Sequence, residues 1–181
     1  MAGAPSFGKI STFICWMAIT EANALRLPVF LEPLPVTKTD KGYSVVKTGE
    51  ALARITGVAS ALGDSSRYLW LKLPYCDGYE AVSRATTLPI LLLGGESAES
   101  AAPFLTQLAS ALTAGPNVRG ALVGRNVLYP GDEDPLAVAA AAGGIIHNGW
   151  SVEEALNSLA APKGRDMDYL SRHFERQRRS L

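Results

Sequence analysis

Four short apolar runs alternate with longer stretches rich in alanine and leucine along this sequence. Each run is nearly continuous in apolar residues, which is typical of a parallel strand whose two faces are both covered. The alternation of such strands with helical stretches predicts an α/β fold built from parallel βα units. The predicted strands cover residues 27–35, 68–75, 88–95 and 119–126.

The stretches between and around the predicted strands have helical composition. Helices are predicted at residues 10–26, 48–62, 78–86, 97–113 and 134–147. A further helix is predicted to begin after Ser151, because Glu154 stands three residues later and the two form a capping-box pattern. Asp132, Glu133 and Asp134 crowd the start of the preceding helix, where negative charge is favourable.

Length and composition predict one domain followed by a basic segment. The 181 residues are 48% hydrophobic, which suffices for a core of domain size. Residues 1–162 are predicted to form this domain, and residues 163–181 a basic terminal helix or tail. The formal net charge is zero, so neither nucleic acid nor an anionic membrane is expected as a partner. An RNA- or lipid-binding arm is the alternative for the basic segment, although it lacks interleaved aromatic residues.

The chain is predicted to be cytoplasmic. Its two cysteines, Cys15 and Cys76, lack the spacing of a disulfide framework or a metal site, as is usual in a reducing compartment. The N-terminal apolar run partly resembles a secretory signal peptide, but Glu21 interrupts it. No apolar run approaches the roughly 20 residues of a membrane-spanning helix. His147 and His173 have no partner at metal-ligand spacing, so no metal or other cofactor is predicted.

Polar side chains and glycines stand near the carboxyl end of each predicted strand. They are Glu32, Lys72, the pair Gly94 and Gly95, and the segment 124–126. In parallel α/β sheets this edge binds ligands, because strand ends fix side chains while the loops leave room for a substrate. We therefore expect these groups to lie on one rim.

Lys72 stands near the end of the apolar run 67–75 and is the candidate nucleophile. Burial would lower the pKa of its amine and leave a neutral group able to attack a carbonyl and form a Schiff base. Tyr68 and Trp70 would form an aromatic wall if they share its side of the strand. The alternative is a lysine that closes the strand and reaches into solvent. Glu32 is the candidate proton-transfer group, with an ordinary strand-end ion pair as its alternative.

A candidate phosphate site follows the last two predicted strands. Gly94, Gly95 and Ser97 lead into a predicted helix, and glycines there let backbone N–H groups approach an anion. Arg125 follows Gly124 after the next strand, and a guanidinium matches two phosphate oxygens at once. A tight strand-to-helix turn is the alternative explanation for the glycine pair.

These motifs together resemble a known enzyme family. The segments LEPLPV, LKLPY, LPILLLGGES and VRGALVGRNVLYP are similar to the C-terminal half of class I, Schiff-base-forming aldolases of the (β/α)8 superfamily. The similarity is greatest to an aldolase-like family associated with myo-inositol catabolism, over residues 10–142. The resemblance implies that Lys72 forms the imine, that Glu32 helps to transfer protons, and that Tyr75 assists nearby. It also implies a sugar-phosphate cradle formed by Gly94, Gly95, Gly124 and Arg125.

The resemblance further implies a partial barrel. A complete (β/α)8 barrel needs about 250 residues, whereas this sequence supplies the equivalent of strands five to eight with their helices. An open four-stranded sheet exposes two edges and an apolar face. Three explanations are open: a half-barrel that pairs with its own copy, one that needs a separately encoded N-terminal half, or the truncated product of a longer gene. The N-terminal segment, which joins a helix in mid-pattern, favours the third.

We therefore expect a class I aldolase or aldolase-like domain that acts on a phosphorylated sugar or keto acid without a metal. The alternative from another class is a non-catalytic half-barrel that binds sugar phosphates or serves in assembly. A doubly wound nucleotide-binding domain is disfavoured, because no predicted strand is followed by the glycine-rich dinucleotide fingerprint.

Overall fold

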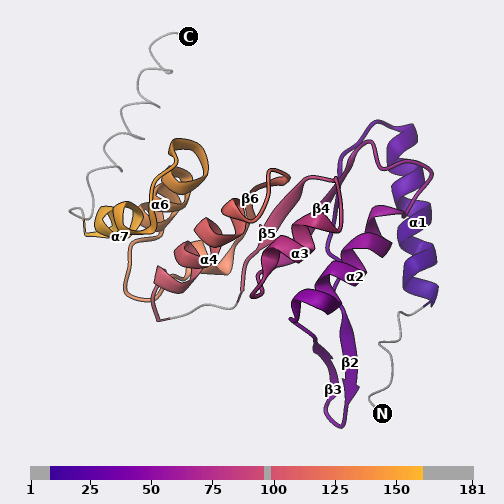
Figure 1. Ribbon diagram of the computed structural model, residues 1–181, viewed down its shortest axis with the longest axis horizontal. Coiled ribbons are helices and arrows are strands. Elements are labelled where there is room, and N and C mark those ends of the chain that lie inside the picture. Colours follow the sequence, from indigo (N-terminus) through magenta and orange to yellow (C-terminus); the bar gives the residue numbers. More distant parts are fainter. Residues whose placement is uncertain (1–8, 96–98, 161–181) are drawn as a thin grey trace, which may run out of the picture. The chain divides into compact units, whose positions relative to one another are not determined.

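Residues 9–95 and 99–160 are described by a computed structural model of the chain (Figure 1). The chain divides into two units. The first comprises Met1–Gly95 with Gln107–Val123, and the second comprises Glu96–Thr106 with Gly124–Leu181. The predicted basic segment at 163–181 lies outside the described residues.

The first unit is built around a four-stranded parallel sheet. Its strands are β1 (Val29–Leu31), β4 (Leu69–Pro74), β5 (Ile90–Leu93) and β6 (Val118–Leu122), in the order β1-β4-β5-β6. Each connection between neighbouring strands contains a helix, as parallel pairing requires. The predicted fold class is confirmed: the protein is mixed α/β, with parallel βα units and an open sheet.

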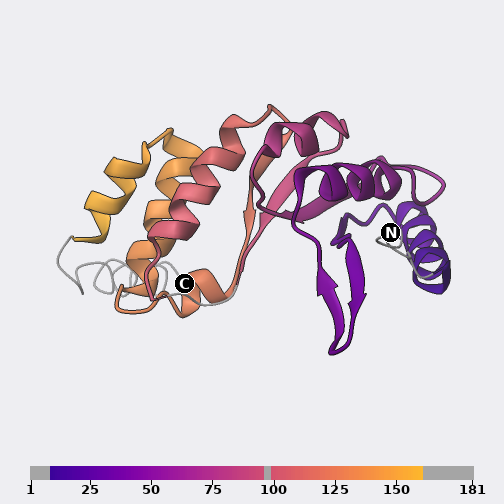
Figure 2. The same ribbon diagram turned by 60° about the horizontal axis from the view of Figure 1, so that its bottom comes forward.

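Helices cover one face of this sheet. α2 (Gly49–Ser60), α3 (Tyr79–Arg84) and the second half of α4 (Ala102–Thr113) lie on the same side of it (Figure 2). Strand residues that point to this side, such as Leu71 and Leu92, are buried and form the core. The preceding helix, α1 (Lys9–Ala24), adds the buried Ile19.

The opposite face of the sheet carries large apolar side chains that are only partly buried. We call five of them the open face: Phe30, Trp70, Leu91, Leu93 and Leu122. Phe30 is 49% exposed and Leu122 is 44% exposed. The apolar strands are therefore fully covered on one side alone within the described part of the first unit. In a closed barrel of this kind the corresponding face is filled by side chains from the other strands.

A solvent-exposed hairpin was not predicted from the sequence. β2 (Val36–Thr39) and β3 (Gly42–Val45) pair antiparallel between β1 and α2. The two strands are almost entirely exposed. Their sequences lack the apolar run from which the strands of the main sheet were predicted. The one local signal is Gly42, whose φ of 121° closes the turn after Asp40 and Lys41.

The fourth predicted strand ends earlier than the apolar pattern indicates. β6 stops at Leu122, and Arg125–Leu128 form a short helix, α5, in place of the predicted strand end. The backbone N–H groups of the last two residues of α5 donate to the carbonyl of Gly124 at 3.0 and 2.9 Å. These local hydrogen bonds take the segment out of the extended conformation.

The second unit contains α6 (Pro135–Asn148) and α7 (Val152–Leu159). Asp134 caps α6 through its side chain. The predicted capping box of α7 is confirmed: Glu154 N donates to Ser151 Oγ at 3.1 Å, and Ser151 N donates to Glu154 Oε2 at 2.7 Å.

Glu133 precedes α6 in the sequence, but its side chain binds residues that lead into α4. It accepts hydrogen bonds from Ser100 Oγ at 3.1 Å and from the Ala101 backbone at 3.3 Å. It thus binds the segment that leads into α4. That helix begins at Ala102, later than the predicted start at 97.

Replacing Ser151 with alanine is expected to destabilise α7 by about 1 kcal/mol at neutral pH, the usual effect of losing such a cap. Hydrogen bonds from the backbone N–H and then the hydroxyl of Ser151 hold the pKa of Glu154 below its ordinary value. A carboxyl group whose pKa is lower in the folded than in the unfolded state stabilises the fold. This stabilisation is fully present above the pKa of the unfolded state and is lost as pH falls through the pKa of the folded state. Urea unfolding followed by helical circular dichroism should therefore show a smaller native-to-variant difference at pH 3 than at pH 7. An undiminished difference at pH 3 contradicts this role of Glu154.

Candidate active site

Lys72 and Glu32 form an ion pair on the sheet of the first unit. Lys72 lies in β4, and Glu32 directly follows β1. Because Leu31 pairs with Leu71 in the parallel register, the next residue of each segment comes beside the other. Lys72 Nζ donates a hydrogen bond to Glu32 Oε2 at 2.8 Å. The structure thus brings together the predicted nucleophile and the predicted proton-transfer group.

This ion pair is accessible but not free in solvent. The Lys72 side chain is 22% exposed and the Glu32 side chain is 38% exposed. The amine is therefore within reach of a substrate, while its hydrogen bond and the strand backbone fix its direction. At 2.8 Å the two groups are close enough to exchange a proton directly.

Aromatic residues flank the ion pair, although not all of them are the predicted ones. Trp70 stands two residues before Lys72 and so projects from the same face of β4. Its ring lies 6.0 Å from that of Phe30, its neighbour on β1. Tyr68, predicted to be part of this wall, precedes β4 and lines a separate cavity with Arg67. Phe30 was missed because the pairing of β1 with β4 is not visible in the sequence.

Tyr75, Cys76 and Tyr79 form a packed group just after β4. The rings of Tyr75 and Tyr79 stack with centroids 5.7 Å apart. Burial, followed by the nearby charges of Asp77 and Glu80, raises the pKa of the Cys76 thiol. Burial, followed by Cys76, raises the pKa of Tyr79. These two buried groups are therefore poor nucleophiles at neutral pH, whereas the role of Tyr75 stays a prediction.

Replacing Tyr79 with phenylalanine is expected to leave the free energy of unfolding unchanged or to raise it by up to about 1 kcal/mol. The side chain is buried, and its hydroxyl has no hydrogen-bond partner among the described residues. The variant keeps the stacked ring and removes the desolvated hydroxyl. Chemical denaturation measures the change, with Tyr75→Phe as the control. A loss of more than 1 kcal/mol would show that the Tyr79 hydroxyl has a stabilising partner.

The predicted phosphate residues fall into separate parts of the chain. Gly94 and Gly95 follow β5 in the first unit, whereas Gly124 and Arg125 belong to the second unit. Ser97 lies outside the described residues. Arg125 is exposed and opens α5. A common site for these residues stays a prediction.

The described residues show neither a metal cluster nor a membrane span. No group of three His, Cys, Asp or Glu side chains within 9–95 and 99–160 is arranged to hold a metal ion. Over the same residues, no helix has the length and apolar character needed to cross a membrane. Cys15 and Cys76 are both free thiols.

Comparison with known proteins identifies the family. The family model described as Cgl0159-like matches residues 8–143. The chain belongs to the Cgl0159-like family. Cgl0159 from Corynebacterium glutamicum (Brevibacterium flavum) has a solved structure that is 34% identical, with a TM-score of 0.71 over 77% of this chain and 46% of that chain. No curated protein matches the sequence.

Solved aldolases are also structural neighbours of this Cgl0159-like chain. An archaeal fructose 1,6-bisphosphate aldolase is 26% identical, with a TM-score of 0.60 over 76% of this chain and 52% of that chain. A Schiff-base-forming fructose-1,6-bisphosphate aldolase is 26% identical, with a TM-score of 0.59 over 75% and 52%. The neighbours are aldolase-like barrels, and this chain spans about half of their length. The resemblance to class I aldolases is thus supported as a distant structural similarity.

Proposed function

We propose that this protein is a class I aldolase, a carbon–carbon lyase that cleaves or forms a phosphorylated sugar or keto acid through an imine on Lys72. The observation that carries the proposal is the hydrogen bond of 2.8 Å between Lys72 and Glu32 beside Trp70. Imine formation needs a group that accepts and returns protons beside the amine, and a carboxylate in direct contact with the amine can do this. The distant similarity to Schiff-base aldolases supports the same chemistry.

The two side chains suffice for imine formation. Lys72 gives a proton to Glu32, and its neutral amine adds to the carbonyl carbon of the substrate while an N–H proton moves to the oxygen. The resulting carbinolamine loses water when its hydroxyl takes the proton back from Glu32, which leaves a protonated imine and a carboxylate.

Carbon–carbon cleavage follows from the charge of the imine. The protonated imine accepts the electron pair of the breaking bond and becomes an enamine, while the proton of the substrate hydroxyl passes to the Glu32 carboxylate and the aldehyde leaves. Protonation of the enamine carbon and hydrolysis by water release the ketone and restore Lys72. Tyr75 is proposed to assist near the imine, on the strength of its place three residues after Lys72.

The substrate is proposed to be held by its phosphate. As donors to this anion we propose backbone N–H groups of Gly94, Gly95 and Ser97 together with the Gly124–Arg125 segment. We place the substrate among the keto-sugar phosphates of inositol or carbohydrate catabolism, in the cytoplasm. The two free cysteines fit that compartment.

A cleavage assay in the presence of a chelator tests the proposed function. The protein is mixed with fructose 1,6-bisphosphate or a keto-sugar phosphate, and release of the aldehyde is followed with a coupled dehydrogenase. Cleavage that persists in EDTA is expected for imine chemistry, which uses no metal. Cleavage abolished by EDTA, or none with any of these substrates, would refute the proposal.

A second candidate function is that of a half-barrel that binds a sugar phosphate without turnover. The four-stranded sheet with one open face favours it, because the site then lacks the remaining strands of a closed barrel. Calorimetry with the same sugar phosphates separates the two functions, because binding without cleavage supports the second. For either function we propose that the open face is covered by a second half-barrel, from another copy or another chain. Light scattering that gives a monomer mass would exclude pairing of two copies.

A further inference from the structure

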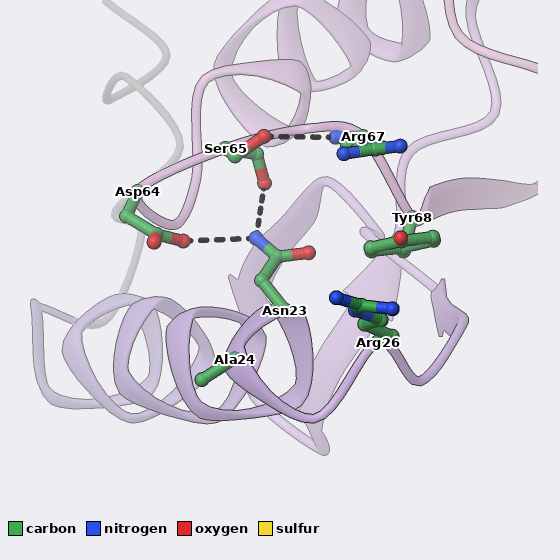
Figure 3. Close-up of a pocket in the computed structure, with 7 residues that line it drawn as sticks. All are labelled: Asn23, Ala24, Arg26, Asp64, Ser65, Arg67 and Tyr68. Atoms are coloured by element: carbon green, nitrogen blue, oxygen red, sulfur yellow. Dashed lines mark hydrogen bonds between the residues drawn. The ribbon is translucent and has the colours of Figure 1, made fainter.

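A second candidate site lies at the other end of β4 from the ion pair. A cavity of about 270 Å³ lies between the end of α1 and the segment that leads into β4 (Figure 3). Tyr68 in its lining precedes β4, whereas Lys72 stands four residues further, which is about 13 Å along a strand. The cavity belongs wholly to the first unit. It is lined mainly by Asn23, Arg26, Asp64, Ser65, Arg67 and Tyr68.

The lining of the cavity contains more basic than acidic side chains. Neither Arg26 nor Arg67 forms an ion pair with any residue that the structure describes. Figure 3 shows the two guanidinium groups on either side of the Tyr68 ring. Arg67 Cζ lies 5.3 Å from the centre of that ring, which holds the guanidinium by a cation–π contact. Two unpaired guanidinium groups beside a cavity favour an anion as its occupant.

Arg26 has an unusual backbone conformation at the end of α1. Its φ of 57° makes it the one residue other than glycine with a left-handed backbone in the described chain. Leu27 N donates to Ala22 O and Arg26 N to Asn23 O, the two hydrogen bonds of a Schellman helix end. Glycine is the usual residue at this position, because every other residue is strained there. Here an arginine accepts that strain, and its guanidinium lines the cavity.

Hydrogen bonds keep the remaining wall in place. Asn23 Nδ2 donates to Asp64 Oδ1 at 2.9 Å and to the Ser65 carbonyl at 2.5 Å. The Arg67 backbone N–H donates to Ser65 Oγ at 3.2 Å. These contacts join the end of α1 to the segment before β4. Among the charged side chains of the lining, one acidic residue, Asp64, stands against two arginines.

We propose that this cavity binds the phosphate group of a small phosphomonoester at a site distinct from Lys72. The lining has two guanidinium groups and one carboxylate, and this excess of positive charge favours a dianion over a singly charged carboxylate. The volume exceeds that of the bare anion, which leaves room for an attached organic group. The inference does not depend on the aldolase chemistry.

Calorimetry with inorganic phosphate and glycerol phosphate tests this site. An Arg125→Gln background removes the arginine of the predicted catalytic phosphate cradle, and Arg26→Gly is added to it. We expect the background protein to bind one equivalent, glycerol phosphate more tightly than phosphate, and Arg26→Gly to weaken binding at least about tenfold. Because glycine relieves the left-handed strain, the melting temperature of Arg26→Gly without ligand should be equal to or above that of the background.

Two further variants complete the test. Arg54→Gln changes an exposed arginine on α2 outside the cavity and should leave binding unaltered. Arg67→Gln should weaken binding as Arg26→Gly does, and it serves if the glycine variant does not fold. Equal affinity in the Arg26 or Arg67 variants, tighter binding of bare phosphate, or no binding at millimolar ligand would each overturn the proposal.

Discussion

Replacing Lys72 with methionine is expected to lower kcat/KM for cleavage by at least about 10³-fold, because no other group then forms the imine. Methionine has a similar length and no amine, and the site is partly open, so the fold should tolerate it. Glu32, which loses its partner, is 38% exposed and stays hydrated. The change is measured by steady-state kinetics of the coupled cleavage assay, with circular dichroism to confirm folding.

Lys38→Met supplies the matched control. Lys38 lies on the exposed hairpin strand β2 and has no part in the proposed site. Its variant should keep the activity of the native protein. A folded Lys72→Met variant that keeps more than a tenth of native activity would show that the chemistry does not pass through an imine at Lys72.

Leu92→Ala is expected to lower the free energy of unfolding by about 2–5 kcal/mol, whereas Leu91→Ala should lower it by about 1 kcal/mol or less. The two residues are neighbours on β5 and point to opposite faces of the sheet. Leu92 is 1% exposed under the helices, and Leu91 belongs to the open face. Urea unfolding of both variants at one low protein concentration measures the difference.

The comparison of these two variants also reports whether the open face becomes covered. If a second half-barrel packs against it, the Leu91→Ala penalty should rise with protein concentration for a second copy, or on addition of the other chain. Equal penalties for the two variants in a protein that stays monomeric would contradict a sheet with one covered and one open face.

The sequence was sufficient to predict the parallel sheet and the shared rim of Glu32 and Lys72. Parallel strands with helical connections place their carboxyl ends together, so both residues were expected on this rim, where the structure joins them by a hydrogen bond. The capping box of Ser151 and Glu154 was predictable because it depends on residues three apart. Features set by short-range spacing or by the apolar pattern were thus accessible before the structure.

Features that depend on which strands pair, or that lie in exposed polar segments, were not predictable. The β2–β3 hairpin has no apolar run, and Phe30 joins the site only because β1 pairs with β4. The left-handed backbone of Arg26 could not be predicted, because such a helix end is usually recognised by a glycine and this position holds an arginine. The division of the predicted phosphate residues between two units was not visible in the sequence either.

The most direct measurement is to locate the covalent intermediate. The protein is incubated with dihydroxyacetone phosphate, reduced with borohydride, digested and analysed by peptide mass spectrometry. An imine at Lys72 predicts a stable adduct on the peptide that contains this residue and on no other lysine. An adduct elsewhere, or none in a folded protein that binds the ligand by calorimetry, would contradict the assignment of Lys72 as the nucleophile.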